Sequence, residues 1–315
     1  MRNFIVIILL FIAFNSNASD TTRYYFDANW KKISQEKAVF YRKKFKNNQK
    51  IWTAFDYYKN GQIQMSGTYA SKKLKSKEGN FVYYYKNGQR ASEGNYSKNK
   101  RTGNWKFWHD NGLISSEGEF VDGFKSGEWK YWFDNGVPST NGKYDSKGLE
   151  TGYWKKFHKN GNIDAEGNYV KGKYNDVWKF YFNSGKISAI ETYQDSVLTD
   201  IKFWNEGGSV EDKNLIPEIM PKYIGGEEAL YKYLFNTVNY PKSARDNNIQ
   251  GTVYIKFIIG YDGSVEDVDV VRSVNPLLDA EALKVIKEMP KWTIAKSHNR
   301  PARVTFTLPI KFKLK

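Results

Sequence analysis

Gly103-Asn-Trp-Lys-Phe-Trp-His-Asp-Asn-Gly112, followed by Glu117-Gly118-Glu119-Phe120, is the stretch that decides the fold. An Asn-Gly pair between two runs of alternating residues predicts a two-residue hairpin turn of type I′, because both central residues of that turn need a positive φ. We therefore expect two antiparallel strands joined at Asn111-Gly112. Variants of this stretch recur along the chain, which indicates a repeat fold.

The repeat has a period of about 24 residues. Its turn glycines are separated by 27, 24, 24, 25 and 24 residues and stand at Gly61, Gly88, Gly112, Gly136, Gly161 and Gly185. A second glycine follows six residues later in five units, at Gly67, Gly94, Gly118, Gly142 and Gly167, whereas the sixth unit has Glu191. We expect a mainly β ribbon of stacked antiparallel hairpins, because one hairpin alone cannot bury its apolar face.

Counting outward from the turn predicts which residues face each other across a hairpin. Trp105 is expected opposite Gly118, so that a large ring covers a residue without a side chain, and Trp129, Trp154 and Trp178 repeat this position. Further pairs expected on the same face are Phe107 with Ser116, His109 with Ile114, Tyr131 with Thr140 and Phe133 with Pro138. An aromatic column completes the predicted core at Tyr69, Tyr96, Phe120, Tyr144, Tyr169 and Tyr193.

The opposite face of the predicted ribbon carries a candidate ligand surface of interleaved cations and rings. Its members are Lys106, Trp108, Lys130, Trp132, Lys155, Phe157, Lys179 and Tyr181. Such a surface can hold an anionic lipid, a glycan or an acidic peptide. The alternative is a solvated face that neutralises itself, since Glu117 is expected opposite Lys106 and Glu166 opposite Lys155.

These units resemble the bacterial MORN-type repeat over roughly Trp52 to Trp204, with about six units and a degenerate seventh. The resemblance implies an elongated antiparallel ribbon that serves as a scaffold or a binding surface. His109 and His158 occupy the position where other units carry Tyr or Phe, so we expect them to be structural.

The C-terminal hundred residues follow a different pattern, which begins at Pro217 after the short break Asn205-Glu206-Gly207-Gly208-Ser209. Apolar spacing predicts two helices, Glu227–Asn236 and Asp279–Glu288. Three strands are expected at Gly251–Gly260, Ser264–Val271 and Arg303–Phe312. The order αββαβ predicts a small sheet with helices packed on one face.

This region resembles the C-terminal domain of the TonB family in its Bacteroidetes-like form. The motifs that carry the resemblance include Gly225-Gly226-Glu227-Glu228-Ala229-Leu230, Tyr240-Pro241, Asp262-Gly263-Ser264-Val265, Met289-Pro290-Lys291-Trp292 and Arg303-Val304-Thr305-Phe306. The family implies a periplasmic module that engages TonB-dependent outer-membrane receptors when a short receptor peptide adds as a strand to an exposed sheet edge.

Carried onto this sequence, the resemblance places the receptor-binding edge at Val304, Thr305, Phe306, Thr307 and Leu308, with Asn239 and Tyr240 in the receptor-proximal stretch. Pro309 fits an edge strand, because proline is hard to place inside a sheet. If Phe306 and Leu308 are core residues, the backbone of the strand carries the binding.

The N-terminus predicts export. Met1–Asp20 begins with Arg2 and has an apolar run of 11 residues from Phe4 to Phe14, short of the roughly 20 that a membrane span needs. Small residues at Ser16-Asn17-Ala18 indicate a secretory signal cleaved after Ala18, with an uncleaved anchor as the alternative. Zero cysteines exclude disulfides, thiolate zinc sites and a lipidated N-terminal cysteine.

The net charge of +15 first suggests a nucleic-acid partner. Residues 1–216 hold most of this excess, with 34 Lys and Arg against 23 Asp and Glu, so the charge belongs mainly to the signal, its flank and the ribbon. Export also separates the chain from chromosomal DNA and most RNA, so we expect no nucleic-acid partner.

We expect five segments: a signal peptide at 1–18, a flank at 19–51, MORN-like repeats at 52–206, a linker at 207–216 and a TonB C-terminal-like domain at 217–315. The sequence has no Gly-rich phosphate loop and no Gly-x-Ser-x-Gly elbow, so we expect no enzyme activity, no catalytic residues, no metal and no cofactor.

The leading hypothesis is a periplasmic adaptor, soluble or membrane-associated, that binds TonB-dependent outer-membrane transport components or other envelope proteins by strand addition. One alternative is an envelope scaffold whose ribbon binds anionic lipid, glycan or peptide. A third hypothesis is a TonB energy transducer, which requires that the N-terminus stays in the membrane as an anchor. Only eight prolines occur in the chain, too few for the Pro-rich spacer of such a transducer.

Overall fold

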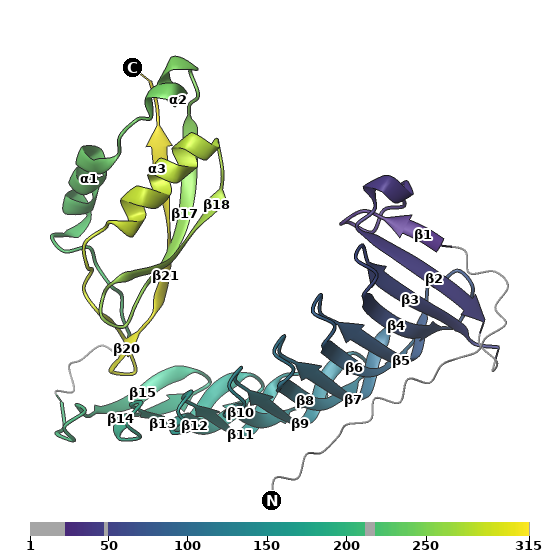
Figure 1. Ribbon diagram of the computed structural model, residues 1–315. Helices are drawn as coiled ribbons and strands as arrows, with labels where there is room; N and C mark the ends of the chain where they lie inside the picture. Colours follow the sequence, from purple (N-terminus) through teal and green to yellow (C-terminus); the bar gives the residue numbers. More distant parts are fainter. Residues whose placement is uncertain (1–22, 47–49, 212–217, 315) are drawn as a thin grey trace, which may run out of the picture. The chain divides into compact units, whose positions relative to one another are not determined.

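The computed structural model describes residues 23–46, 50–211 and 218–314 (Figure 1). The expected signal peptide and much of the expected linker lie outside these ranges. The chain divides into two compact units, residues 1–154 and 155–315.

Fifteen antiparallel strands follow one another in a single sheet, each beside its neighbours in the sequence. The strands are β1 (Arg23–Phe26), β2 (Phe40–Lys46), β3 (Trp52–Tyr58), β4 (Ile63–Tyr69), β5 (Lys77–Tyr84), β6 (Arg90–Ser97), β7 (Lys100–Trp108), β8 (Ile114–Val121), β9 (Phe124–Trp132), β10 (Pro138–Tyr144), β11 (Glu150–Phe157), β12 (Ile163–Val170), β13 (Lys173–Tyr181), β14 (Ile187–Gln194) and β15 (Val197–Phe203). A short 3-10 helix, η1 (Gln35–Lys37), precedes β2. The predicted hairpin ribbon is confirmed.

The turns at the Asn-Gly pairs differ from the prediction. His109 N–H donates to Leu113 O over 2.8 Å, and Gly112 N–H donates to His109 O over 3.0 Å. Gly112 has a φ of 85°, whereas Asn111 keeps a negative φ. The connection is therefore a three-residue loop that ends in a left-handed glycine, and the type I′ prediction at this position is wrong.

The extra loop residue shifts the register beside the turn. Trp108 faces Ile114, and Trp132 faces Pro138, each next to a β-bulge. The predicted pairs of His109 with Ile114 and of Phe133 with Pro138 are therefore wrong. Farther from the turn the predicted register is confirmed, because Trp105 faces Gly118, Phe107 faces Ser116 and Tyr131 faces Thr140.

Turns with two positive φ values, as a type I′ turn requires, occur at the opposite ends of the strands, where one hairpin leads into the next. Lys98 and Asn99 have φ values of 49° and 69°, and Asp195 and Ser196 have values of 52° and 69°. Two-residue turns of this kind need a left-handed conformation at both positions.

In three units, the asparagine before the turn glycine acts through its side chain. Asn111 Oδ1 accepts the Leu113 N–H over 3.0 Å, and Asn111 Nδ2 donates to Asp134 O in the next turn over 2.6 Å. The amides of Asn87 and Asn160 make the same two kinds of bond. One amide thus closes its own loop and ties it to the following one.

The tryptophan column forms the ribbon core by covering the glycines of neighbouring strands. A Cβ added at Gly118 would lie 2.3 Å from a ring atom of Trp129, the tryptophan of the following hairpin. Trp105 covers Gly94 in the same way, and it is 1% exposed. Each ring therefore covers the glycine of the unit before it, while it faces the glycine of its own unit across the strand pair.

The indole N–H explains why this position carries tryptophan. Trp105 Nε1 donates to Asn95 O over 3.1 Å, and Trp129 Nε1 donates to Glu119 O over 3.1 Å. Both carbonyls lie at irregularities of the strand ladder, which leave them open to a side-chain donor. The aromatic column packs edge-on against the same rings, as Phe120 does against Trp129 with centroids 5.1 Å apart.

The C-terminal domain consists of two small sheets and three helices. One sheet has the order β18-β17-β21, and the other has the order β16-β19-β20. The elements are β16 (Glu218–Ile219), α1 (Gly226–Thr237), α2 (Lys242–Asp246), β17 (Gly251–Ile259), β18 (Val265–Arg272), α3 (Pro276–Lys287), β19 (Ala295–Ser297), β20 (Arg300–Ala302) and β21 (Val304–Phe312). The predicted αββαβ order is present, with α2, β16, β19 and β20 as additions.

The core of this domain lies between β17 and the helices α1 and α3 (Figure 1). Val253, Ile255 and Phe257 of β17 are fully buried. Helix α3 begins three residues before the predicted start, because Asn275 caps it by accepting the Leu277 N–H over 3.0 Å and Pro276 opens its first turn.

Candidate functional site

Strand β21 lies at the edge of the sheet β18-β17-β21 and pairs with β17 along its whole length, from Val304 to Phe312. Within the described residues no strand pairs with its other side. An unpaired edge offers a row of backbone N–H and C=O groups to an incoming strand. Five of the sequence-predicted site residues, Val304 to Leu308, lie on this strand.

Side chains along β21 alternate between the core and solvent. Phe306 packs against Phe257 and Trp292, with ring centroids 5.9 and 5.0 Å apart. Leu308 also packs against the core, whereas Thr305 and Thr307 are exposed. The large apolar side chains thus hold the strand on the domain, and the two threonines face solvent.

Asn239 and Tyr240 lie in the segment after α1, outside the edge strand. Tyr240 packs edge-on against Phe312 at the end of β21, with centroids 5.6 Å apart, and its hydroxyl donates to Ile249 O over 2.6 Å. Asn239 N–H donates to the Glu281 carboxylate of α3 over 2.8 Å. These contacts place Tyr240 beside the last residue of β21 and attach Asn239 to a helix.

The lysines of the ribbon surface face carboxylates. Lys106 Nζ lies 3.7 Å from Glu117, and Lys155 Nζ lies 3.4 Å from Glu166. Glu117 also stands opposite Lys130 on the following strand, as Glu166 stands opposite Lys179. Positive and negative charges therefore alternate across the strands, and much of the lysine column is neutralised within the ribbon.

The aromatic column beside these lysines is partly buried. Trp108, Trp132 and Tyr181 face Ile114, Pro138 and Ile187 across their hairpins, and the Tyr181 hydroxyl donates to Glu166 over 2.8 Å. Phe157, at the end of β11, is half-buried as well. The rings thus expose only part of their surfaces.

The ribbon histidines connect neighbouring repeats. His109 Nε2 lies 2.9 Å from Trp132 O, and His158 Nε2 lies 3.0 Å from Tyr181 O. Tyr85 makes the equivalent bond from its hydroxyl to Trp108 O over 2.7 Å. Among the described residues no group of three or more His, Cys, Asp and Glu side chains could hold a metal ion.

The third histidine was not connected to any site by the sequence. His298 lies between β19 and β20, and its Nδ1 is 2.8 Å from Glu191 of β14. The usable signal in the sequence was Glu191 itself, the one departure from glycine at the second glycine position.

The structure thus defines a ribbon of hairpin repeats followed by a small α+β domain with an open sheet edge. Residues 236–314 match the family described as Gram-negative bacterial TonB protein C-terminal. Residues 77–98, 150–171 and 177–195 match the MORN repeat variant. The chain therefore contains MORN-type repeats and a TonB C-terminal domain. Both are non-catalytic families, and together they indicate a protein-interaction role at the Gram-negative envelope.

Other similarities are distant. No curated protein matches the chain. The crystal structure of TcdB2-TccC3 is similar over 57% of this chain and 12% of that chain, with 11% sequence identity and a TM-score of 0.18. A TM-score this low defines no shared fold. Among the described residues no helix has both the length and the apolar character needed to cross a membrane.

Proposed function

We propose that this chain is an exported, non-enzymatic adaptor of the periplasm that binds TonB-dependent outer-membrane transport components by β-strand addition to β21. The observation that carries the proposal is the open edge of β21 in a domain that matches the TonB C-terminal family. Strand addition takes affinity from main-chain hydrogen bonds and selectivity from alternate side chains. Thr305 and Thr307, both exposed on β21, would supply the selective contacts.

Pro309 indicates which backbone groups face the open edge. Proline has no N–H to give to a neighbouring strand, so it is found at edges where that direction points to solvent. Backbone N–H directions alternate along a strand. The N–H groups of Thr305 and Thr307, at the same alternation as Pro309, are therefore expected to point toward an incoming strand.

The test uses the exported chain and synthetic peptides from the N-terminal segments of TonB-dependent receptors of the same bacterium. Thr307→Pro and Thr307→Val both remove the threonine hydroxyl, but only Thr307→Pro also removes the outward N–H. Peptide affinity should therefore be about tenfold lower for Thr307→Pro than for Thr307→Val, a difference that corresponds to loss of one backbone hydrogen bond. Fluorescence anisotropy measures binding, and circular dichroism checks that both variants fold. Equal binding by both folded variants, or no binding of any peptide by the native chain, would contradict the proposal.

The ribbon surface supports a second candidate function, an envelope scaffold that binds anionic lipid, glycan or peptide. Lys130 favours it, because this exposed lysine stands between Glu117 on one side and the uncharged Asn141 on the other. Vesicles that contain anionic lipid would be mixed with the native chain and with a variant that has Ser at Lys106, Lys130, Lys155 and Lys179. Salt-sensitive binding by the native chain alone supports this function, and no binding at low salt contradicts it.

The N-terminus decides between the adaptor and an energy transducer. Sequencing the protein recovered from cells should give a mature chain that starts near Ser19. Retention of Arg2 would contradict the soluble adaptor and support a membrane-anchored transducer.

A further inference from the structure

The sixth repeat carries a buried acid, Glu191, at the position where the other units carry their second glycine. Glu191 stands opposite Trp178, where five other units carry glycine, and its side chain is fully buried. The Tyr193 hydroxyl donates to one of its oxygens, and His298 Nδ1 lies 2.8 and 2.9 Å from the two oxygens. A buried carboxylate is costly unless it is paired and hydrogen-bonded, so His298 supplies a contact that this position needs.

His298 belongs to the tip of the β19–β20 hairpin, which comprises Ser297, His298, Asn299 and Arg300. The imidazole stacks on Phe180 of β13, with centroids 3.6 Å apart and planes inclined by 6°. Phe180 is 2% exposed, and its ring continues the column of Phe107 and Tyr131 on the core face of the ribbon. The tip thus covers the end of the aromatic core, where the next strand places Ile201, and not a tryptophan, opposite Glu191.

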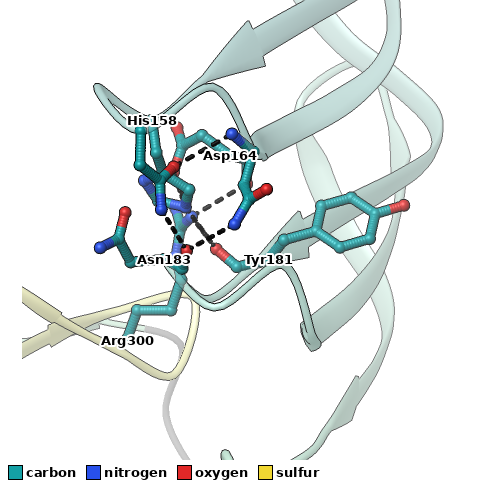
Figure 2. Close-up of polar contacts among 7 residues, drawn as sticks. His158, Asp164, Tyr181, Asn183 and Arg300 are labelled. Atoms are coloured by element: carbon teal, nitrogen blue, oxygen red, sulfur yellow. Dashed lines mark hydrogen bonds and ion pairs between the residues drawn. The ribbon is translucent and has the colours of Figure 1, made fainter.

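Arg300 of the tip contacts two strands of the ribbon, and Figure 2 shows it beside Asp164 and Tyr181. Its Nη1 donates to Tyr181 O over 2.7 Å, to Asp164 O over 2.9 Å and to the Asp164 carboxylate. His158 Nε2 lies 3.4 Å from the same carboxylate. One guanidinium therefore binds β13 and the start of β12, and its side chain is only 16% exposed.

Asn299 completes the contact from the other side of the turn. Its Nδ2 donates to Trp204 O over 3.0 Å and to the Glu211 carboxylate over 2.7 Å. His298 and Asn299 have φ values of 51° and 60°, so the tip is a two-residue turn with both residues in the left-handed region. Asn and His tolerate this conformation better than most residues, which allows polar side chains at both positions.

The charges on the two sides are complementary. The ribbon contributes Asp164 and Glu191, the segment after β15 contributes Glu211, and the tip contributes Arg300 together with the N–H groups of His298 and Asn299. Most of these groups are buried or half-buried, and buried ionic contacts are sensitive to the loss of one partner. A surface of this kind recognises one particular partner, in contrast to the exposed lysine pairs of the ribbon.

We propose that the β19–β20 tip is a docking plug that seats the TonB C-terminal domain on strands β12 to β14 of the last repeats. Glu191 makes these repeats a docking site for the tip. It replaces the glycine that a tryptophan of a following repeat would cover. The contact between the tip and strands β12 to β14 does not use the open edge of β21. It fixes the domain to the ribbon through strands β12 to β14, in addition to the covalent linker.

The absence of cysteine from the native chain allows a distance measurement in the full mature protein. Spin labels are placed on Asp200→Cys in β15 and Lys287→Cys in α3, both exposed and outside the contact. Double electron–electron resonance should give one narrow distance distribution. Arg300→Glu, which sets two acids against each other, and Glu191→Gly, which restores the residue of the other repeats, should each broaden it at least twofold.

Lys291→Glu is the matched control, because Lys291 pairs with Asp262 inside the C-terminal domain. This variant should keep the narrow distribution. Circular dichroism checks that every variant retains its strands, and Glu191→Gly is the second probe should Arg300→Glu fail to fold. A broad distribution in the native chain, or an unchanged narrow one in Glu191→Gly, overturns the proposal.

Discussion

At the scale of single residues, the ribbon depends on positions where a side chain is missing. Gly118 lies beneath the ring of Trp129, and the indole N–H reaches the next carbonyl, Glu119 O. The glycine and the indole hydrogen bond depend on each other, because a Cβ at position 118 would occupy the space of the Trp129 ring. The missing side chain of Gly118 therefore provides the space that the Trp129 ring fills in the core.

Gly118→Ala should destabilise the ribbon by about 1–3 kcal/mol, the usual cost of overpacking a tight core. The added Cβ would meet a Trp129 ring atom at 2.3 Å, so the ring must move and its hydrogen bond must lengthen. Urea denaturation followed by tryptophan fluorescence measures the change. Glu119→Ala, one residue away and exposed, is the control and should change stability by less than about 0.5 kcal/mol. Equal midpoints for the two variants would show that the ring does not need the glycine.

Asp262 predicts an acid-sensitive contribution to the C-terminal domain. Hydrogen bonds from Lys291 and Ser264 hold the pKa of this carboxyl below its ordinary value of 3.8. A depressed pKa in the folded state stabilises the fold above the ordinary pKa, and this contribution is lost as the pH falls through the folded value. The free energy of unfolding should therefore fall less steeply below pH 4 in Asp262→Asn than in the native chain. Because the pair is exposed, added salt should reduce the difference, and parallel acid profiles would contradict the assignment.

At the scale of elements, local spacing predicted the strand pairs but not the turns. Trp105 and Gly118 could be matched by counting, since a register holds along a regular strand. The loop at Asn111-Gly112 could not, because a type I′ turn and a three-residue loop both favour this dipeptide and differ by one residue. That residue displaced His109 and Phe133 from their predicted partners. The start of α3 was visible in Asn275-Pro276, a cap followed by proline, which apolar spacing alone overlooks.

A type I′ turn and the observed three-residue loop predict opposite effects of Asn111→Gly on stability. In a type I′ turn glycine would relieve a positive φ, but in this loop it removes two side-chain hydrogen bonds and adds backbone freedom. The variant should lose about 1–2 kcal/mol of stability, as judged by thermal and urea unfolding. Asp110→Ala keeps the carbonyl that Asn87 binds and should be nearly neutral. A stabilising effect of Asn111→Gly would favour the two-residue turn.

At the scale of the whole molecule, the two family matches and the αββαβ order were accessible from motifs that lie within a few residues of one another. The edge position of β21 could be anticipated from Pro309, which restricts a strand to an edge. The docking of His298 could not, since Glu191 is 107 residues away and no short pattern records such a distance. Sequence alone marked Glu191 only as an irregularity.

Repeat architecture predicts that one complete unit can be removed. Deleting the 24 residues 112–135 joins Asn111 to Gly136 and places Gly142 opposite Trp105. The shortened chain should retain its strand content and unfold cooperatively, because each remaining interface keeps its partners. Circular dichroism and thermal unfolding measure both properties. Deleting residues 112–123 removes a strand and a turn glycine, so this control should fail to fold, and equal behaviour of the two deletions would contradict the repeat boundaries.

The way each tryptophan covers the glycine before it gives the ribbon a polarity. A unit added within the ribbon brings a ring for the preceding glycine and receives a ring from the unit that follows. A unit added after Glu191 would have no following tryptophan to cover its own glycine. It would also separate the Glu191 carboxylate from His298. Repeats are therefore expected to be gained or lost in the interior of the ribbon and not at its C-terminal end. The length of the ribbon can then evolve while the docking site of the C-terminal domain stays the same.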